Sequence, residues 1–266
     1  MQKRIPLSPV QRFLLCLALI ALAGGGNIAP AYAAEELTIA AAADLTFAFK
    51  DVAAKFQAQT GDSAKLSFGS SGNFFSQIQN GAPYDLFFSA DISYAQKLEA
   101  AGLTEPGSLY KYAIGKIVLW VPADSKLDVS KGLTVLTDPA IHKIAIANPE
   151  HAPYGRAAMA AIKHDGLYDQ IKDQIVLGEN ISQTAQFVQS GNADIGVIAL
   201  SLAISPAMKD KGKYFEIPTD DYPAIEQAAV ILKSSKHKEL AQKFIAFLKQ
   251  PDATELMQRY GFVVPK

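Results

Sequence analysis

The sequence predicts an α/β protein made of two units that share one order of elements. Short apolar runs alternate with stretches whose apolar residues recur at helical spacing, which indicates strands joined by crossover helices. The same alternation starts again after a longer apolar run at residues 113–121. Such repeats favour, in each unit, a parallel sheet with right-handed crossovers. Because no low-complexity segment, charge run or Pro-rich linker separates the units, we expect them to touch and the chain to cross between them more than once.

In the first unit, three strands each precede a helix. The apolar runs predict strands at 37–42, 64–68 and 85–88. The first helix is predicted to begin at Asp44 and to end at Gly61, and its apolar residues fall on one face. Two further helices are expected from about 74 to 81 and from 92 to 101.

The second unit follows the same pattern. Strands are predicted at 144–147, 175–177 and 195–199, with helices at 156–163 and 184–189. A further strand at 226–232 and helices at 236–248 and 252–260 complete the chain, the last helix being stopped by Gly261.

The first 33 residues have the features of a secretory signal peptide. Three basic residues precede or flank an apolar run at 13–23, three glycines follow, and Ala31-Tyr32-Ala33 forms an A-x-A cleavage site. The run is too short to span a bilayer, so a retained membrane anchor is not expected. The sequence therefore predicts cleavage after Ala33 and a periplasmic protein.

The composition of the mature chain excludes several classes of protein. The whole chain has 25 Lys+Arg and 26 Asp+Glu, and removal of the signal leaves 22 basic and 26 acidic residues, a formal net charge of −4. Nucleic acids and anionic membranes are bound mainly through Lys and Arg, so neither is an expected partner. The single cysteine, Cys16, lies within the signal, so no disulfide framework is possible.

Polar loops follow several of the predicted strands. Asp44 follows the first strand, and the segments 69–73, 148–155 and 178–182 follow later ones. In open α/β sheets ligands bind at these strand ends, where helix N-termini present free N–H groups and attract anions. Each Ser, Asn or Asp could instead serve only as a helix cap. Since Arg156 is the sole basic residue close by, an anion here would be held by neutral dipoles.

Motifs for catalysis or cofactors are missing. Gly69-Ser70-Ser71-Gly72 is not the G-x-S-x-G pattern, no nucleotide-binding Gly-rich loop with a following Lys is present, and the four histidines lack metal-ligand spacing. We therefore expect neither an enzyme nor a cofactor. An exported serine hydrolase using Ser71 stays open as an alternative, and it would need a base from the distant half of the chain.

Five segments resemble the periplasmic molybdate-binding proteins of ABC transporters over essentially the whole mature chain. The segments are Thr-Ile-Ala-Ala-Ala at 38–42, Ser-Phe-Gly-Ser-Ser-Gly at 67–72, Gly-Ala-Pro-Tyr-Asp-Leu-Phe-Phe-Ser-Ala-Asp at 81–91, Asn-Pro-Glu-His-Ala-Pro-Tyr-Gly at 148–155 and Arg-Tyr-Gly-Phe at 259–262. The resemblance implies a two-lobed type II periplasmic binding protein fold, each lobe a mostly parallel sheet flanked by helices, with the ligand cleft between them. Lobe one would comprise 34–112 plus 226–266 and lobe two 113–225. Crossing strands near Ala113 and Gln227 would form the hinge.

The resemblance also implies which residues hold the oxyanion. Ser71 would donate its hydroxyl and N–H, and Ile181 its N–H, without any cation. Tyr154 is expected to replace a tyrosine donor that some relatives have where this chain has Ala199. The molybdate oxyanion would thus be bound through Ser71, Tyr154 and Ile181.

Asp44 departs from the family, whose members often have a hydroxyl residue there. A deprotonated oxyanion and a carboxylate both offer only acceptors. Asp44 could cap its helix, accept a bond from a protonated oxyanion such as hydrogen phosphate, or have its acid form stabilised. We expect it to cap, accepting from the N–H of Thr46 or Phe47, because the geometry is local and a helix start favours negative charge.

The sequence as a whole predicts a monomeric solute-binding protein of an ABC importer. It would capture molybdate or tungstate and deliver it to the membrane permease. Sulfate, phosphate or chromate remain as alternative oxyanions.

Overall fold

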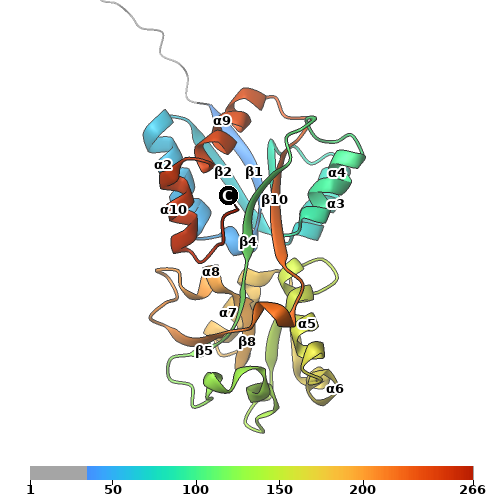
Figure 1. Ribbon diagram of the computed structural model, residues 1–266, viewed down its shortest axis with the longest axis vertical. Helices are drawn as coiled ribbons and strands as arrows, with labels where there is room; N and C mark the ends of the chain where they lie inside the picture. The colour runs from blue at the N-terminus through green and yellow to red at the C-terminus, as the bar shows by residue number, and fades with distance from the viewer. Residues whose placement is uncertain (1–34, 266) are drawn as a thin grey trace, which may run out of the picture. The chain divides into compact units, whose positions relative to one another are not determined.

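Two five-stranded sheets, each flanked by helices, form the two lobes of the protein. The computed structural model describes residues 35–265, and Figure 1 shows one lobe around β1, β2, β4 and β10 and the other around β5 and β8. The predicted signal peptide and its cleavage site lie outside the described residues. Within those residues, no helix is both long and apolar enough to cross a membrane.

The first sheet has the order β2-β1-β3-β10-β4. Its strands are β1 (Glu36–Ala42), β2 (Ser63–Gly69), β3 (Leu86–Ser89), β4 (Tyr110–Gly115) and β10 (Ile225–Ile231). β1 runs parallel to β2 and β3, as the repeated strand–helix pattern predicts, whereas β10 is antiparallel to β3 and β4. The sheet is therefore mixed.

The second sheet has the order β7-β6-β8-β5-β9 and the same mixture of directions. Its strands are β5 (Ile117–Pro122), β6 (Ile144–Ala147), β7 (Ile175–Gly178), β8 (Ile195–Ala199) and β9 (Gly212–Glu216). β6 is parallel to β7 and β8, while β5 is antiparallel to β8 and β9. The sequence pattern did not predict β9.

The long apolar run at 113–121 is divided between the two sheets. β4 ends at Gly115 in the first sheet and β5 begins at Ile117 in the second, so the chain crosses between the lobes at Lys116. It returns between β9 and β10. The boundaries at 112/113 and 225/226 remain a prediction, and β4 runs across the first of them.

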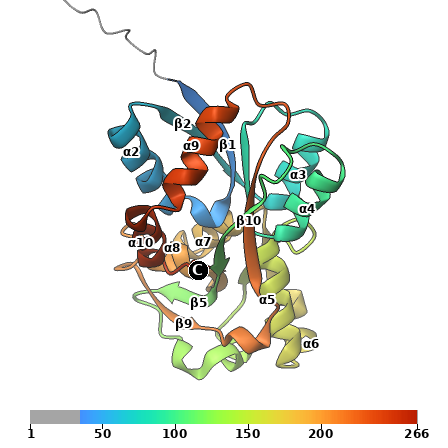
Figure 2. The ribbon, with the colours of Figure 1, turned by 45° about the horizontal axis from the view of Figure 1, so that its top comes forward.

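Helices cover both faces of the first sheet. Figure 2 shows α2, α9 and α10 on one side and α3 and α4 on the other. Successive residues of a strand point to opposite faces of the sheet. Ile39 and Phe88 pack on the side of α2, α9 and α10, whereas Ala40 and Phe87 pack on the side of α3 and α4. The long helices are α2 (Ala48–Thr60), α3 (Ser71–Gln79), α4 (Ile92–Ala100), α5 (Pro153–His164), α7 (Ile181–Gln189), α9 (Lys238–Leu248) and α10 (Pro251–Arg259). Shorter ones are α6 (Tyr168–Ile171), α8 (Leu200–Ala203) and the 3-10 segments η1 (Ala43–Leu45), η2 (Val129–Thr137), η3 (Lys172–Gln174) and η4 (Thr219–Asp221).

Three helices begin earlier than the apolar periodicity indicates. Instead of residues 74, 156 and 184, helices α3, α5 and α7 start at Ser71, Pro153 and Ile181. The spacing of apolar residues does not predict a first helical turn that faces a cavity, because the residues of such a turn do not pack in the core. Capping residues and a proline at the first helical position mark these starts instead.

The start of α5 is held tightly against the end of β6. A Cβ on Gly155 would lie 2.0 Å from the carbonyl oxygen of Ala147, so no side chain fits between helix and strand there. This close approach fixes the first turn of α5 beside the opposite lobe.

Candidate functional site

A small cavity lies between the two lobes at the ends of the parallel strands. Its walls come from the ends of β1 and β2 and the starts of α3, α5 and α7. No Lys, Arg or His is among the lining residues, which are Ala42, Ala43, Asp44, Gly69, Ser70, Ser71, Ala90, Ala152, Pro153, Tyr154, Asn180 and Ile181. All four site residues predicted from the sequence therefore meet here.

Three of these residues occupy the first turns of their helices. Ser71 opens α3, Tyr154 is the second residue of α5, and Ile181 opens α7. A helix supplies no acceptor for the N–H groups of its first turn, and its N-terminus carries a partial positive charge. Three such N-termini from two lobes make the cavity a site for an anion.

The capping side chains leave these N–H groups to the cavity. Ser70 accepts from the N–H of Asn73 at 3.4 Å, and Asn180 accepts from the N–H groups of Ser182 and Gln183, both at 3.0 Å. The caps thus satisfy the N–H groups deeper in α3 and α7.

The hydroxyl of Ser71 is oriented as a donor. Its side chain is fully buried, and its Oγ accepts a hydrogen bond from the N–H of Ala90 at 2.9 Å. This accepted bond leaves the hydroxyl proton available for donation to a ligand.

Asp44 does not cap a helix, so that prediction is wrong. It lies in η1, before α2, and α2 begins after Phe47 without a side-chain cap. The N–H of Thr46 donates to the carbonyl of Ala43 instead, at 3.2 Å. The 3-10 turn after β1 directs the carboxyl group inward, where it is 1% exposed.

The Asp44 carboxyl has one satisfied and one unsatisfied oxygen. Its Oδ2 accepts from the Tyr154 hydroxyl at 3.0 Å and from Gln227 Nε2 at 2.8 Å. Its Oδ1 is buried without a hydrogen-bond partner among the described residues. Burial raises the pKa of this carboxyl to about 6, and the two hydrogen bonds only partly oppose that effect.

The hydroxyl of Tyr154 is hydrogen-bonded to Asp44 and Gln227. It donates to Asp44 Oδ2 and accepts from Gln227 Nε2 at 2.9 Å, and its use as a replacement donor to the oxyanion stays a prediction. Burial raises the pKa of Tyr154 well above its ordinary value, so the phenol stays neutral. The N–H of Tyr154 lies in the first turn of α5, where the helix supplies no acceptor for it.

Gln227 is the residue that the sequence analysis missed as part of the site. It was expected only near a hinge strand, yet its side chain is fully buried on β10 and holds both Asp44 and Tyr154. A lone amide within the apolar strand Ile-Glu-Gln-Ala-Ala-Val-Ile is the signal that could have indicated it.

The basic side chains near the cavity, Arg156 and His151, are engaged outside it. Arg156 pairs with Asp91 at 2.6 Å and lies over the ring of Tyr94. His151 Nδ1 lies 3.0 Å from Ser70 Oγ, with Nε2 3.7 Å from Glu179. An anion in the cavity would therefore be held by N–H and hydroxyl dipoles alone.

Direct contacts join the two lobes around the cavity. The N–H of Gly72 donates to the carbonyl of His151 at 2.9 Å, and Ser182 Oγ donates to the carbonyl of Ala43 at 2.8 Å. A Cβ on Gly72 would come within 2.8 Å of the same His151 oxygen, so this approach requires glycine. The structure shows the lobes closed over the site.

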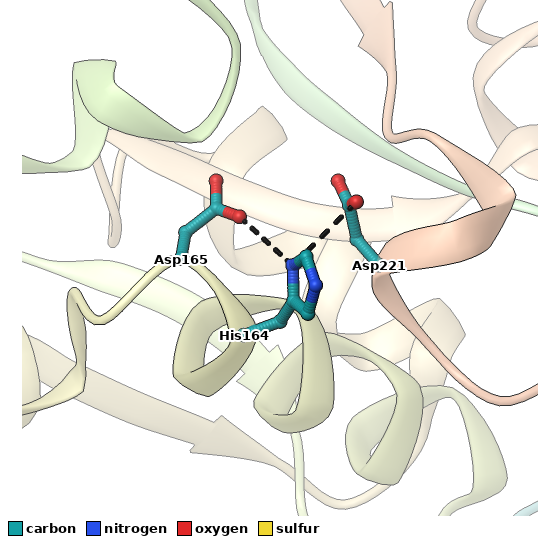
Figure 3. Close-up of side chains that lie close together, drawn as sticks. All are labelled: His164, Asp165 and Asp221. Atoms are coloured by element: carbon teal, nitrogen blue, oxygen red, sulfur yellow. Dashed lines mark hydrogen bonds and ion pairs between the residues drawn. The ribbon is translucent and has the colours of Figure 1, made fainter.

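A second polar cluster lies at the other end of α5. His164 Nδ1 is 3.2 Å from Asp165 Oδ1 and 3.6 Å from Asp221 Oδ1 (Figure 3). The group is the one set of three His, Asp or Glu side chains within 35–265 that is spaced to share a metal ion. Because His164 is exposed and its Nδ1 already contacts both carboxylates, the cluster is a surface contact separate from the cavity.

Asp44 should make stability depend on pH in a defined direction. A carboxyl whose pKa rises from 3.8 to about 6 on folding costs stability as pH rises through that window, by roughly 3 kcal/mol in full. Asp44→Asn removes this cost. The variant's free energy of unfolding, relative to wild type, should therefore increase by about 2.5 kcal/mol between pH 4 and pH 8 in urea titrations. A difference that stays constant with pH would contradict a buried, titrating Asp44.

Comparisons with known proteins agree with this geometry. A family profile described as bacterial extracellular solute-binding protein matches residues 37–263. The molybdate-binding protein of Azotobacter vinelandii is 41% identical over 250 residues, which cover 94% of this chain and 98% of that protein. That of Rhodobacter capsulatus is 39% identical over 231 residues, 87% of this chain and 89% of the relative.

A solved structure extends the match to three dimensions. The Azotobacter vinelandii periplasmic molybdate-binding protein superimposes with a TM-score of 0.82 at 38% identity, covering 86% of this chain and all of that one. This confirms the two-lobed binding protein fold, and the relatives are binding proteins rather than enzymes. The chain belongs to the bacterial extracellular solute-binding protein family, in the group of the periplasmic molybdate-binding proteins.

Proposed function

We propose that this protein captures molybdate or tungstate outside the cytoplasm and delivers it to the permease of an ABC transporter. The observation that carries the proposal is a cavity between two lobes, with three helix N-termini and no Lys, Arg or His among its lining residues. The printed names of relatives at 41% and 39% identity supply the ligand.

The donor set suits a tetrahedral dianion. Ser71 gives an N–H and a hydroxyl, and Tyr154 and Ile181 each give an N–H from the facing lobe. Because the donors come from both lobes, an anion that reaches all of them holds the lobes together. Sulfate has shorter bonds than molybdate and would leave donors on one lobe out of reach.

Closure on the ligand would occur about the crossing segments near Ala113 and Gln227, with the lobes divided at 112/113 and 225/226. We propose that the protein acts as a monomer, that the closed form is what the permease recognises, and that no cofactor takes part. The direct interlobe hydrogen bonds around the cavity support a closed form that the ligand stabilises.

Export would depend on the signal peptide at 1–33. We propose cleavage after Ala33 because the A-x-A pattern ends there. The intact mass of the exported protein should correspond to a chain beginning at Ala34. A mass that retains residues 1–33, or a lipid on Cys16, would contradict the proposal.

The hydrolase alternative gains no support from the site. The one histidine brought from the other lobe, His151, lies against Ser70, while Ser71 Oγ accepts from the N–H of Ala90. Ser71 thus lacks the adjacent base that a serine nucleophile needs.

Molybdate should stabilise the protein against heat. A ligand at a hundredfold excess over its Kd adds about 2.7 kcal/mol, which for a chain of this size raises Tm by roughly 5–10 °C. A thermal-shift screen should give this rise with molybdate and tungstate and much less with sulfate, phosphate or chromate. Equal shifts with all five anions would contradict selection by size.

Ser71→Ala should weaken binding without unfolding the protein. Loss of a hydroxyl donor to a charged acceptor costs about 1.5–3 kcal/mol, a ten- to hundredfold rise in Kd. Ser76, exposed on the same helix, provides the matched control, and Ser76→Ala should leave Kd unchanged. If calorimetry gives the two variants the same Kd, Ser71 does not contact the ligand.

A further inference from the structure

The unpartnered oxygen of Asp44 has no role in the donor set described so far. Oδ1 is buried, lies on a residue that lines the cavity, and has no hydrogen-bond partner among residues 35–265. We propose that Asp44 binds the ligand in its acid form, with the hydroxyl at Oδ1 donating to one oxygen of the oxyanion, so that each anion is captured together with one proton. The inference rests on the proposed capture of molybdate.

The hydrogen bonds of Asp44 place the proton on Oδ1. Oδ2 already accepts from Tyr154 and Gln227, two neutral donors fixed by burial. If both donors turned to the ligand, Oδ2 would be left unsatisfied. Oδ1 is then the carboxyl atom that is free to carry a proton toward the cavity.

The charges around Asp44 favour the acid form. Tyr154 on α5 and Tyr112 on β4 are the titratable groups that face it, and both are neutral phenols. Gln227 on β10 and Ser201 on α8, which donates to the Asp44 carbonyl, are uncharged. Arg156 and His151 are bound to other partners, so no cation offsets a charge on Asp44.

A dianion in the cavity would strengthen this preference. An ionised carboxylate would face the ligand as a second acceptor and a like charge, whereas the acid supplies a donor. Burial has already raised the Asp44 pKa to about 6, and the ligand would raise it further. On binding, the Asp44 carboxylate takes one proton from solvent, and the resulting carboxylic acid donates a hydrogen bond to the dianion.

Proton uptake can be measured directly with molybdate as the probe. Calorimetric titrations of the wild-type protein at pH 8 in buffers of different ionisation enthalpy should show uptake of about one proton per molybdate bound. Molybdate stays fully deprotonated between pH 6 and pH 8, so Asp44 is the group that gains the proton. Over that range the wild-type Kd should rise about fiftyfold, because the ligand-free carboxyl ionises above pH 6.

Asp44→Asn provides an uncharged donor of the same shape. Its Kd should change less than about threefold between pH 6 and pH 8, its proton uptake should fall to zero, and at pH 8 it should bind molybdate more tightly than wild type. Asp169, which is exposed on α6, gives the matched control: Asp169→Asn should keep the wild-type uptake and Kd at both pH values. Ser71→Ala should bind more weakly at both while keeping the pH dependence.

A spectroscopic readout avoids dependence on folding of the variant. Infrared difference spectra of the wild type at pH 8 should gain the C=O stretch of a protonated carboxyl group when molybdate is added. Binding of molybdate with no proton uptake, no new carboxyl band and a flat pH profile would overturn the inference and leave the proposed function intact. Uptake that persists in Asp44→Asn would overturn it as well. If molybdate does not bind at any pH from 5 to 9, both the proton-uptake inference and the proposed function are overturned.

Discussion

A dianion that leaves water without a cation must find a donor for each of its oxygens. The cavity of this protein meets that constraint with N–H groups from three helices and one serine hydroxyl, and no Lys, Arg or His lines it. Neutral dipoles stabilise a charge only when they point at it. The stabilisation of the anion therefore depends on the donors being fixed in position before the ligand arrives. The rest of the structure can be understood as the means of fixing them.

Each donor is held by features outside the cavity. The Ala90 N–H orients the Ser71 hydroxyl, the Asn180 side chain caps α7, and the close approach of Gly155 to β6 sets the start of α5. The two sheets bring α3 from one lobe opposite α5 and α7 from the other. The site therefore takes its walls from both lobes.

The sequence was sufficient to predict the parallel parts of both sheets, because strands are local patterns, and the family resemblance placed Ser71, Tyr154 and Ile181 in one site. It was insufficient for Asp44. Its partners are Tyr154 and Gln227, 110 and 183 residues away, and only the folded chain brings strand β10 and the facing helix α5 to one carboxyl group. The neighbouring residues indicated that Asp44 caps a helix. In the structure Asp44 lies inside a 3-10 turn that precedes α2, so it is not at the start of that helix. β9 was missed for a similar reason, since its half-exposed residues lack the apolar run that marked the other strands.

The central claim is that the oxyanion is held at this cavity by helix N-termini and by Asp44, without a cation. Anomalous diffraction at the molybdenum edge from crystals grown with molybdate tests it most directly. The account predicts a single strong peak between the starts of α3, α5 and α7, with ligand oxygens in hydrogen-bonding distance of the N–H groups of Ser71, Tyr154 and Ile181 and of Asp44 Oδ1. A peak elsewhere, a cation beside the anion, or an Asp44 carboxyl turned away from the ligand would contradict it.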